Sequence, residues 1–220
     1  MSAIDILITY YPALLGGLLI TLELFLAVSV LGIIFGIILG SIGARYREAG
    51  LLVKIASFLL ASIPFLILMY WFYYPLQSLF KISIEPFFTA LVVLALVDVM
   101  AIAEIVRGVL AEFPRQYISV AQMSGLSNTQ ILRKIQFPMI FRQIIPSLLT
   151  TQVYILQITI LTSLISVPEI FRVAQNINAV IYKPIEIYTS LALLFMVVLA
   201  PINYLAYVLK QRLTRDLSEH

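Results

Sequence analysis

The sequence predicts an all-α integral membrane protein with five transmembrane helices, an N-terminus outside the membrane and a cytoplasmic loop between the third and fourth helices. Of the 220 residues, 62% are hydrophobic and only 11% are charged, whereas a soluble domain has about 25% charged residues. Five apolar segments approach or exceed the roughly 20 residues that a helix needs to cross a bilayer. Basic residues are divided unequally between the two sides that these segments define.

The five segments fix the predicted topology. They lie near residues 14–43, 55–75, 87–108, 143–168 and 187–209. Because their number is odd, the termini fall on opposite sides, and three of the 14 Lys and Arg residues lie with the N-terminus. The other eleven lie with the 110–142 loop and the C-terminus, which we therefore expect to be cytoplasmic: Arg45, Arg47, Lys54, Arg107, Arg115, Arg133, Lys134, Arg142, Lys210, Arg212 and Arg215. The net charge of +3 follows from this topology, so no nucleic acid partner is expected.

The first two segments carry small residues and a proline. Gly32, Gly36 and Gly40 are four residues apart and form a groove that another helix can approach closely, either within this chain or in a second subunit. In the second segment, Pro64 lies two residues after Ser62 and frees a backbone carbonyl that protein, water or ligand must satisfy. The kink is either structural or part of a substrate pathway.

The third segment holds acidic residues at membrane depth, where such a group costs a few kcal/mol unless it faces protein or water. Glu104 and Arg107 are three residues apart and can pair on one helix face, as a structural ion pair or as part of a gate. Asp98 lies deeper, without a partner nearby in the sequence, and is the stronger candidate for a polar cavity.

The loop at residues 114–138 is predicted to form two short helices around a tight turn. The first helix contains Ser119, Val120 and Ala121 and ends at Gly125, a residue that readily adopts the left-handed conformation. After Leu126, Ser127 is placed as the N-cap of the second helix, with Gln130 at capping-box spacing. Pro138 is expected to end that second helix.

The fourth segment ends in the polar stretch Thr162–Phe171, which contains Thr162, Ser163 and Glu169. Glu169 is either a solvated loop charge or a contact for a substrate amine or a delivering protein. A polar outer connection follows, and the fifth segment leads to a basic tail.

At the 114–138 loop the chain resembles the permease subunits of ABC importers, whose loop motif is written EAA-x3-G-x9-I-x-LP. Ala121, Gly125 and Pro138 match this motif, whereas Ser119, Val120 and Phe137 replace its Glu, first Ala and Leu. Two further stretches are similar to the polar amino acid branch of this family, namely AEIVRG at 103–108 and TSL with VPE at 162–169. The resemblance covers about 17–213, in the family's motif order.

The resemblance implies a type I importer fold, with residues 14–213 forming a single transmembrane domain and residues 114–138 coupling it to an ATPase. It implies a second permease subunit, identical or related, an ABC ATPase dimer and an extracytoplasmic solute-binding protein that delivers a polar amino acid or similar small polar solute. We expect no cofactor on this chain, with ATP and Mg²⁺ on the ATPase, because no GxxxxGK[ST] motif is present. Implied substrate-pathway residues are Ser62, Pro64, Asp98, Glu104, Thr162, Ser163 and Glu169.

Two other functions were weighed against this interpretation. An intramembrane hydrolase is disfavoured, because Asp98 and Glu104 are six residues apart and point in different directions on a helix. The chain has no Cys and a single His, at position 220, so neither a thiol nucleophile nor a metal site is expected. A non-transporting membrane scaffold or regulator derived from such a permease is the alternative that the altered loop motif keeps open.

Overall fold

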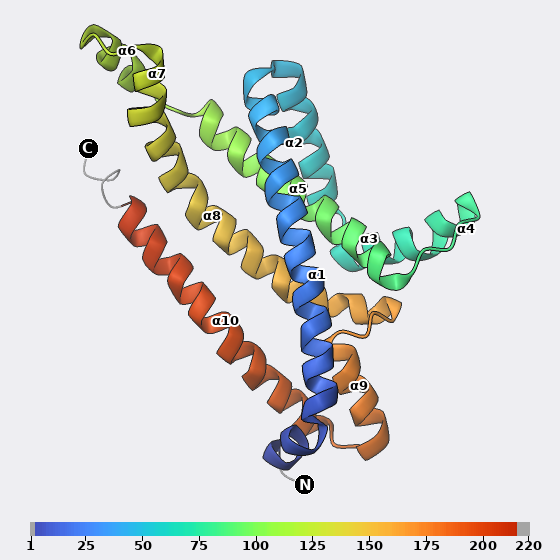
Figure 1. The fold of residues 1–220 in the computed structure, drawn as a ribbon. Helices are drawn as coiled ribbons and strands as arrows, with labels where there is room; N and C mark the ends of the chain where they lie inside the picture. The colour runs from blue at the N-terminus through green and yellow to red at the C-terminus, as the bar shows by residue number, and fades with distance from the viewer. Residues whose placement is uncertain (1–2, 215–220) are drawn as a thin grey trace.

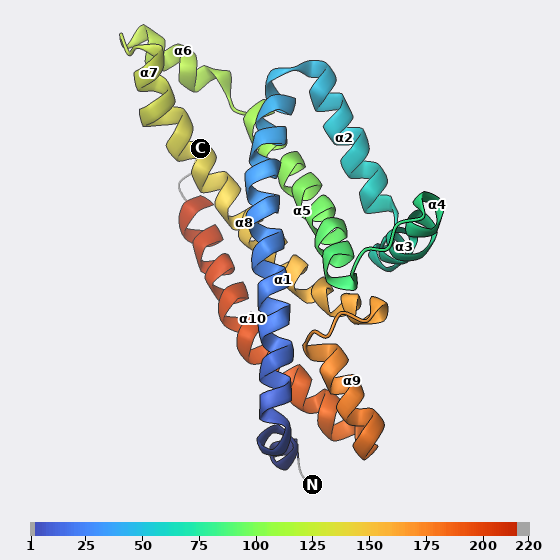
Figure 2. The same cartoon turned by 45° about the vertical axis from the view of Figure 1, so that its right-hand side comes forward.

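The computed structural model describes residues 3–214, and that part of the chain is a bundle of helices (Figure 1). The longest, α1, lies along α5 at the centre of the bundle, and α8 and α10 lie beside them in both views (Figures 1 and 2). The helices are α1 (Ala3–Arg45), α2 (Arg47–Ser62), α3 (Phe65–Trp71), α4 (Gln77–Phe80), α5 (Pro86–Ala111), α6 (Arg115–Met123), α7 (Asn128–Ile131), α8 (Phe137–Ile158), α9 (Ile170–Ile181) and α10 (Pro184–Thr214). Arg215 and His220 lie outside the described residues.

Within this range, four helical stretches are long and apolar enough to cross a membrane, and a bent pair forms a fifth if it counts as one span. The bent pair is the predicted second span. The sequence predicted a kinked helix there, but α2 stops at Ser62 and the chain turns by 96° before continuing from Phe65. The residue before Pro64 is extended (Ile63, φ −93°, ψ 122°), because the proline ring disfavours helical geometry at that position.

The α1–α5 pair is packed through the glycines of α1. Gly32 lies against Asp98, Gly36 against Ile102, and Gly40 against the next turn of α5. A Cβ atom added to Gly32 would lie 1.9 Å from Asp98 Oδ2, so a larger residue would push the two helices apart. The small-residue groove is therefore filled within this chain, which is one of the two alternatives that the sequence left open.

The predicted end of the coupling-loop helix at Pro138 is wrong. Helical structure continues from Asn128 through a π-helical turn (Leu132–Gln136) into α8, so that α7 and α8 form one continuous rod. A proline ring clashes with the carbonyl four residues earlier in a regular α-helix. The wider π turn, in which the Phe137 N–H donates to Leu132 O, accommodates Pro138 without breaking the helix.

The fourth predicted span and the connection after it also differ from expectation. After Ile158 the α-helix changes to a 3₁₀ helix (Thr159–Ile165), which is ended by Ser166, a residue with φ of 71°. The polar connection after it contains an amphipathic helix, α9, whose apolar face packs against α1 and α10 through Ile170, Ala174 and Ile177.

The two ends of the bundle differ in chemistry. The α1–α2 turn and the α6–α7 segment lie at one end in both views, whereas α9 and the start of α10 lie at the other (Figures 1 and 2). The first end brings together basic residues from distant parts of the sequence, including Arg45, Arg47, Arg115 and Lys134. The sequence-based division of charge thus corresponds to one physical end of the bundle.

Candidate functional site

The α6–α7 elbow, defined as residues 114–131, contains the left-handed turn at Gly125 that its sequence predicted. Gly125 has φ of 77°, and its N–H donates to Gln122 O (3.0 Å) while the Leu126 N–H donates to Ala121 O (3.1 Å). These two bonds form a Schellman motif, which requires the left-handed residue that glycine supplies without strain. The predicted end of the first helix is confirmed.

The second helix of the elbow begins with the predicted capping box. Ser127 Oγ accepts from the Gln130 N–H, and Gln130 Oε1 accepts from the Ser127 N–H, so two otherwise unpaired amides are satisfied. Ala121 and Ile131 are buried, whereas Val120 and Met123 are 63% and 88% exposed. The elbow therefore has a small internal core and an exposed apolar tip.

The remaining predicted coupling residues lie on the surface of the same elbow or just beyond it. Ser119 is exposed and its hydroxyl donates back to Arg115 O (3.3 Å), so it offers no carboxylate where the motif has Glu. Leu126 is half-buried at the turn, and Pro138 lies in the first turn of α8. The structure thus groups these residues at one end of the rod that leads into the bundle.

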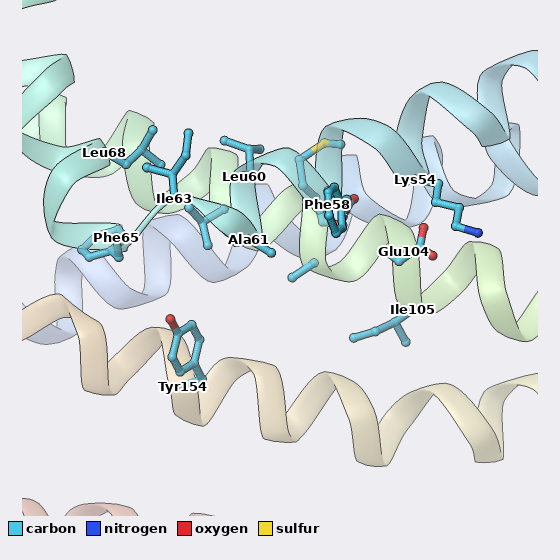
Figure 3. A pocket seen from close by; sticks show the side chains of 14 residues that line it. Lys54, Phe58, Leu60, Ala61, Ile63, Phe65, Leu68, Glu104, Ile105 and Tyr154 are labelled. Carbon is cyan, nitrogen blue, oxygen red and sulfur yellow. Dashed lines mark hydrogen bonds between the residues drawn. The ribbon is translucent and has the colours of Figure 1, made fainter.

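A second feature is a cavity of about 680 Å³ between α2 and α3 on one side and α5 and α8 on the other (Figure 3). This volume lies within the range of about 300–1,000 Å³ that is typical of small-molecule sites. Its lining is mostly apolar: Lys54, Ser57, Phe58, Leu60, Ala61, Ile63, Phe65, Leu68, Val97, Met100, Ala101, Glu104, Ile105 and Tyr154.

The charged groups of this cavity gather at one end. Figure 3 shows Lys54 of α2 and Glu104 of α5 there, with Phe65 and Leu68 at the opposite end and Tyr154 entering from α8. Arg107 donates from two of its nitrogens to Glu104, which confirms the predicted pair. Ser57 donates to the carbonyl of Met100 (3.1 Å) and joins α2 to α5.

Among the predicted pathway residues, Glu104 alone lines this cavity. Ser62 and Pro64 alternate with lining residues, and the Ser62 hydroxyl donates back to Phe58 O (2.8 Å). Sequence reasoning missed Lys54, Ser57 and Tyr154. For the first two, the signal was the helical spacing of Lys54, Ser57, Phe58 and Ala61, which places them on one face of α2.

Asp98 does not line the cavity. It is completely buried between α1, α5 and α8, and Gln152 Nε2 of α8 donates to both of its carboxylate oxygens at 3.0 and 3.1 Å. Ser29 of α1 donates in turn to Gln152 Oε1 (2.5 Å). Sequence analysis missed this network, because Gln152 is 54 residues from Asp98 and 123 residues from Ser29, and the three meet only in the folded bundle.

The polar stretch after α8 is also buried rather than open. Thr162 donates to Thr159 O (2.7 Å), and the Ser163 hydroxyl is buried without a hydrogen-bond partner in the structure. Glu169, beyond the end of the span, is fully buried as the N-cap of α9 and accepts from the Phe171 and Arg172 amides (2.8 and 2.7 Å). Burial raises the pKa of the Glu169 carboxyl to about 7, although the two amides oppose this shift.

Comparison with known proteins decides the family. Residues 9–218 match the model of the binding-protein-dependent transport system inner membrane component. The chain belongs to this family. It is therefore an inner-membrane permease subunit of an ABC importer, and the scaffold alternative gains no support from its relatives.

Two characterised permeases illustrate the similarity. The chain is 25% identical over 210 residues to the histidine/lysine/arginine/ornithine transport system permease protein HisQ of Salmonella typhimurium, covering 90% of this chain and 92% of HisQ. It is 28% identical over 213 residues to the L-cystine transport system permease protein TcyB of Bacillus subtilis, covering 94% and 89%.

Solved structures support the permease fold. The chain superposes on the crystal structure of an amino acid ABC transporter with histidines with a TM-score of 0.82 at 21% identity, covering 94% of this chain and 96% of that one. The inward-facing MetNI methionine ABC transporter gives a TM-score of 0.67 at 21% identity, with 96% and 99% covered. At these identities the likeness establishes the fold of the permease.

Proposed function

We propose that this permease forms half of the translocation path of an ATP-driven amino acid importer, with the α6–α7 elbow docked on a cytoplasmic ABC ATPase dimer. The observation that carries the proposal is the continuity of structure from the elbow to the cavity. The exposed apolar tip at Val120 and Met123 suits insertion into a groove of another protein, and the rod behind it reaches Tyr154 in the cavity wall.

In the proposed assembly the basic end of the bundle faces the cytoplasm and the N-terminus lies outside. A second permease subunit, identical or related, completes the path, and an extracytoplasmic binding protein delivers the solute. ATP and Mg²⁺ bind to the ATPase subunits, and this chain carries no reaction of its own. Closure of the ATPase dimer moves the two elbows and switches the permease between inward-facing and outward-facing states. Because these states bind the solute with different affinities, the switch results in import.

The chemistry of the cavity supports an amino acid as the solute. Lys54 and Glu104 place one cation and one anion at one end of the cavity, which suits the carboxylate and the ammonium group of an amino acid. HisQ and TcyB bear the names of systems for basic amino acids and for cystine. We therefore propose a polar amino acid or a similar small polar solute, held by its backbone groups at the charged end of the cavity.

The Gly125 position tests the docking of the elbow. In Gly125→Val, a β-branched residue must adopt φ of 77°, which costs about 1–2 kcal/mol and distorts the turn. Gly125→Asn is the matched control, because asparagine tolerates this conformation. A Cβ atom at this position meets nothing within 4 Å, so the strain is in the backbone alone.

We expect Gly125→Val to reduce both co-purification of the ATPase and ATP-dependent amino acid uptake in vesicles, and Gly125→Asn to retain both. Uptake by Gly125→Val at the level of the unmodified permease would contradict the docking role. Absence of ATP-dependent uptake by the unmodified complex would contradict the proposed function as a whole.

A further inference from the structure

A polar link lies at the centre of the bundle, and its residues do not line the cavity. It consists of Ser29 in α1, Asp98 in α5 and Gln152 in α8. Both ends of the Gln152 amide are used, since its oxygen accepts from Ser29 and its nitrogen donates to Asp98. The amide is therefore fixed in one orientation, and three helices are joined through one side chain.

Simple helix packing does not account for this link. α1 and α5 already approach closely through the glycine groove, so their contact needs no polar group. A carboxyl group at membrane depth costs several kcal/mol unless protein partners satisfy it. Asp98 is fully buried, and the hydrogen bonds that the structure shows for its carboxylate both come from Gln152. What the link adds is the attachment of α8 to the α1–α5 pair.

Along α8, Gln152 lies between the elbow and the part of the helix that lines the cavity. α8 is the continuation of the elbow, and Tyr154, two residues beyond Gln152, lines the cavity. On α5, Val97 and Met100 flank Asp98 and line the same cavity. The Asp98–Gln152 hydrogen bonds therefore join α5 to α8 beside the residues by which both helices line the cavity.

We propose that Gln152 is a positioning residue for transport, which makes the α5 wall of the cavity move together with the elbow and α8. Apolar helix faces can slide past one another while remaining buried. Sliding of α8 along α5 would instead leave the fully buried Asp98 carboxylate without the donor that Gln152 supplies. The link therefore favours movement of α1, α5 and α8 as one body. This inference rests on the proposed docking of an ATPase at the elbow.

The test uses the permease with its ATPase and binding protein, reconstituted in vesicles, with histidine and cystine as probe solutes. The measured quantity is the amount of solute transported per ATP hydrolysed. Gln152→Leu removes both hydrogen bonds, and Gln152→Asn keeps an amide but is one methylene too short to reach. Asp98→Asn keeps an oxygen that accepts from Gln152. Thr151→Val is the control, because that hydroxyl donates only back to Ser147 O within α8.

We expect Gln152→Leu and Gln152→Asn to lower the solute transported per ATP by about fivefold or more, the smaller end of typical allosteric couplings. Asp98→Asn and Thr151→Val should stay within about twofold of the unmodified complex. A structural role alone would lower thermal stability and leave this ratio unchanged.

An unchanged ratio in either Gln152 variant that assembles would overturn the proposal. If Gln152→Leu does not assemble, Gln152→Asn decides the outcome, because it preserves the polarity of the site. Loss of the ATPase from the unmodified complex is a different result, which would overturn the docking at the elbow.

Discussion

Gly32→Ala is the sharpest test of the central packing. The added Cβ atom would lie 1.9 Å from Asp98 Oδ2, 2.4 Å from Asp98 Cγ and 2.9 Å from Asp98 Cβ. A change of rotamer can move the carboxylate, but the Cβ of Asp98 is fixed to the α5 backbone. The substitution must therefore both displace the carboxylate from Gln152 and separate α1 from α5.

The magnitude follows from these two effects. Loss of hydrogen bonds to a charged group costs about 1.5–3 kcal/mol, and overpacking of a close contact costs about 1–3 kcal/mol. The better helix propensity of alanine returns about 1 kcal/mol. We expect a net loss of about 3 kcal/mol in the free energy of unfolding, measured by equilibrium denaturation of the permease in detergent micelles.

Gly16→Ala provides the matched control in the same helix. A Cβ atom at Gly16 meets nothing within 4 Å, so that variant should be neutral or up to about 1 kcal/mol more stable. Equal stabilities of the two variants would refute the packing argument. A double-mutant cycle with Asp98→Ala adds a second check, because removal of the carboxylate should relieve most of the clash and make the two losses less than additive.

Two further predictions concern helix caps. The folded-state pKa of Glu169 is about 7, above its usual value of 4.5, so between these pH values the folded permease keeps a proton that the unfolded chain loses. The resulting contribution to the free energy of unfolding is complete below about pH 4.5. It falls by about 3 kcal/mol as the pH rises to 7. Denaturation at several pH values should show this slope, and Glu169→Gln should flatten it; an equal slope in both would assign the dependence to other groups. Ser127→Ala removes the hydroxyl that accepts from Gln130 and should destabilise the second elbow helix by about 1 kcal/mol. Hydrogen exchange of the elbow amides should rise relative to Ser124→Ala, whose hydroxyl donates back to Val120 O outside the capping box.

Local signals in the sequence predicted local structure well. The turn at Gly125, the capping box at Ser127 and the Glu104–Arg107 pair depend on residues within three or four positions of one another, so their geometry follows from the sequence alone. The division of basic residues likewise predicted which connections share one end of the bundle.

The two prolines show where sequence reasoning was insufficient. Neither Pro64 nor Pro138 has a backbone N–H. The helix nevertheless ends before Pro64, where the chain bends by 96°, and it continues through Pro138. At Pro138 the preceding turn is a π-helix, whereas at Pro64 the preceding residue is extended, and Pro146 and Pro201 lie inside regular α-helices. A rule that proline ends a helix cannot distinguish the two cases.

The unbroken helix at Pro138 has a mechanical consequence for the permease. A flexible break at that point would absorb any displacement of the elbow before it reached the membrane. In the proposed mechanism, the continuous helix from Asn128 to Ile158 transmits the displacement along α8 to Gln152, and the polar link transmits it to α5. The departure of Ser119 and Val120 from the usual loop motif alters the surface of the elbow, whereas the path behind it depends on Pro138 and Gln152. We therefore expect substitutions at the elbow surface to change ATPase affinity, and substitutions along the rod to change the solute transported per ATP.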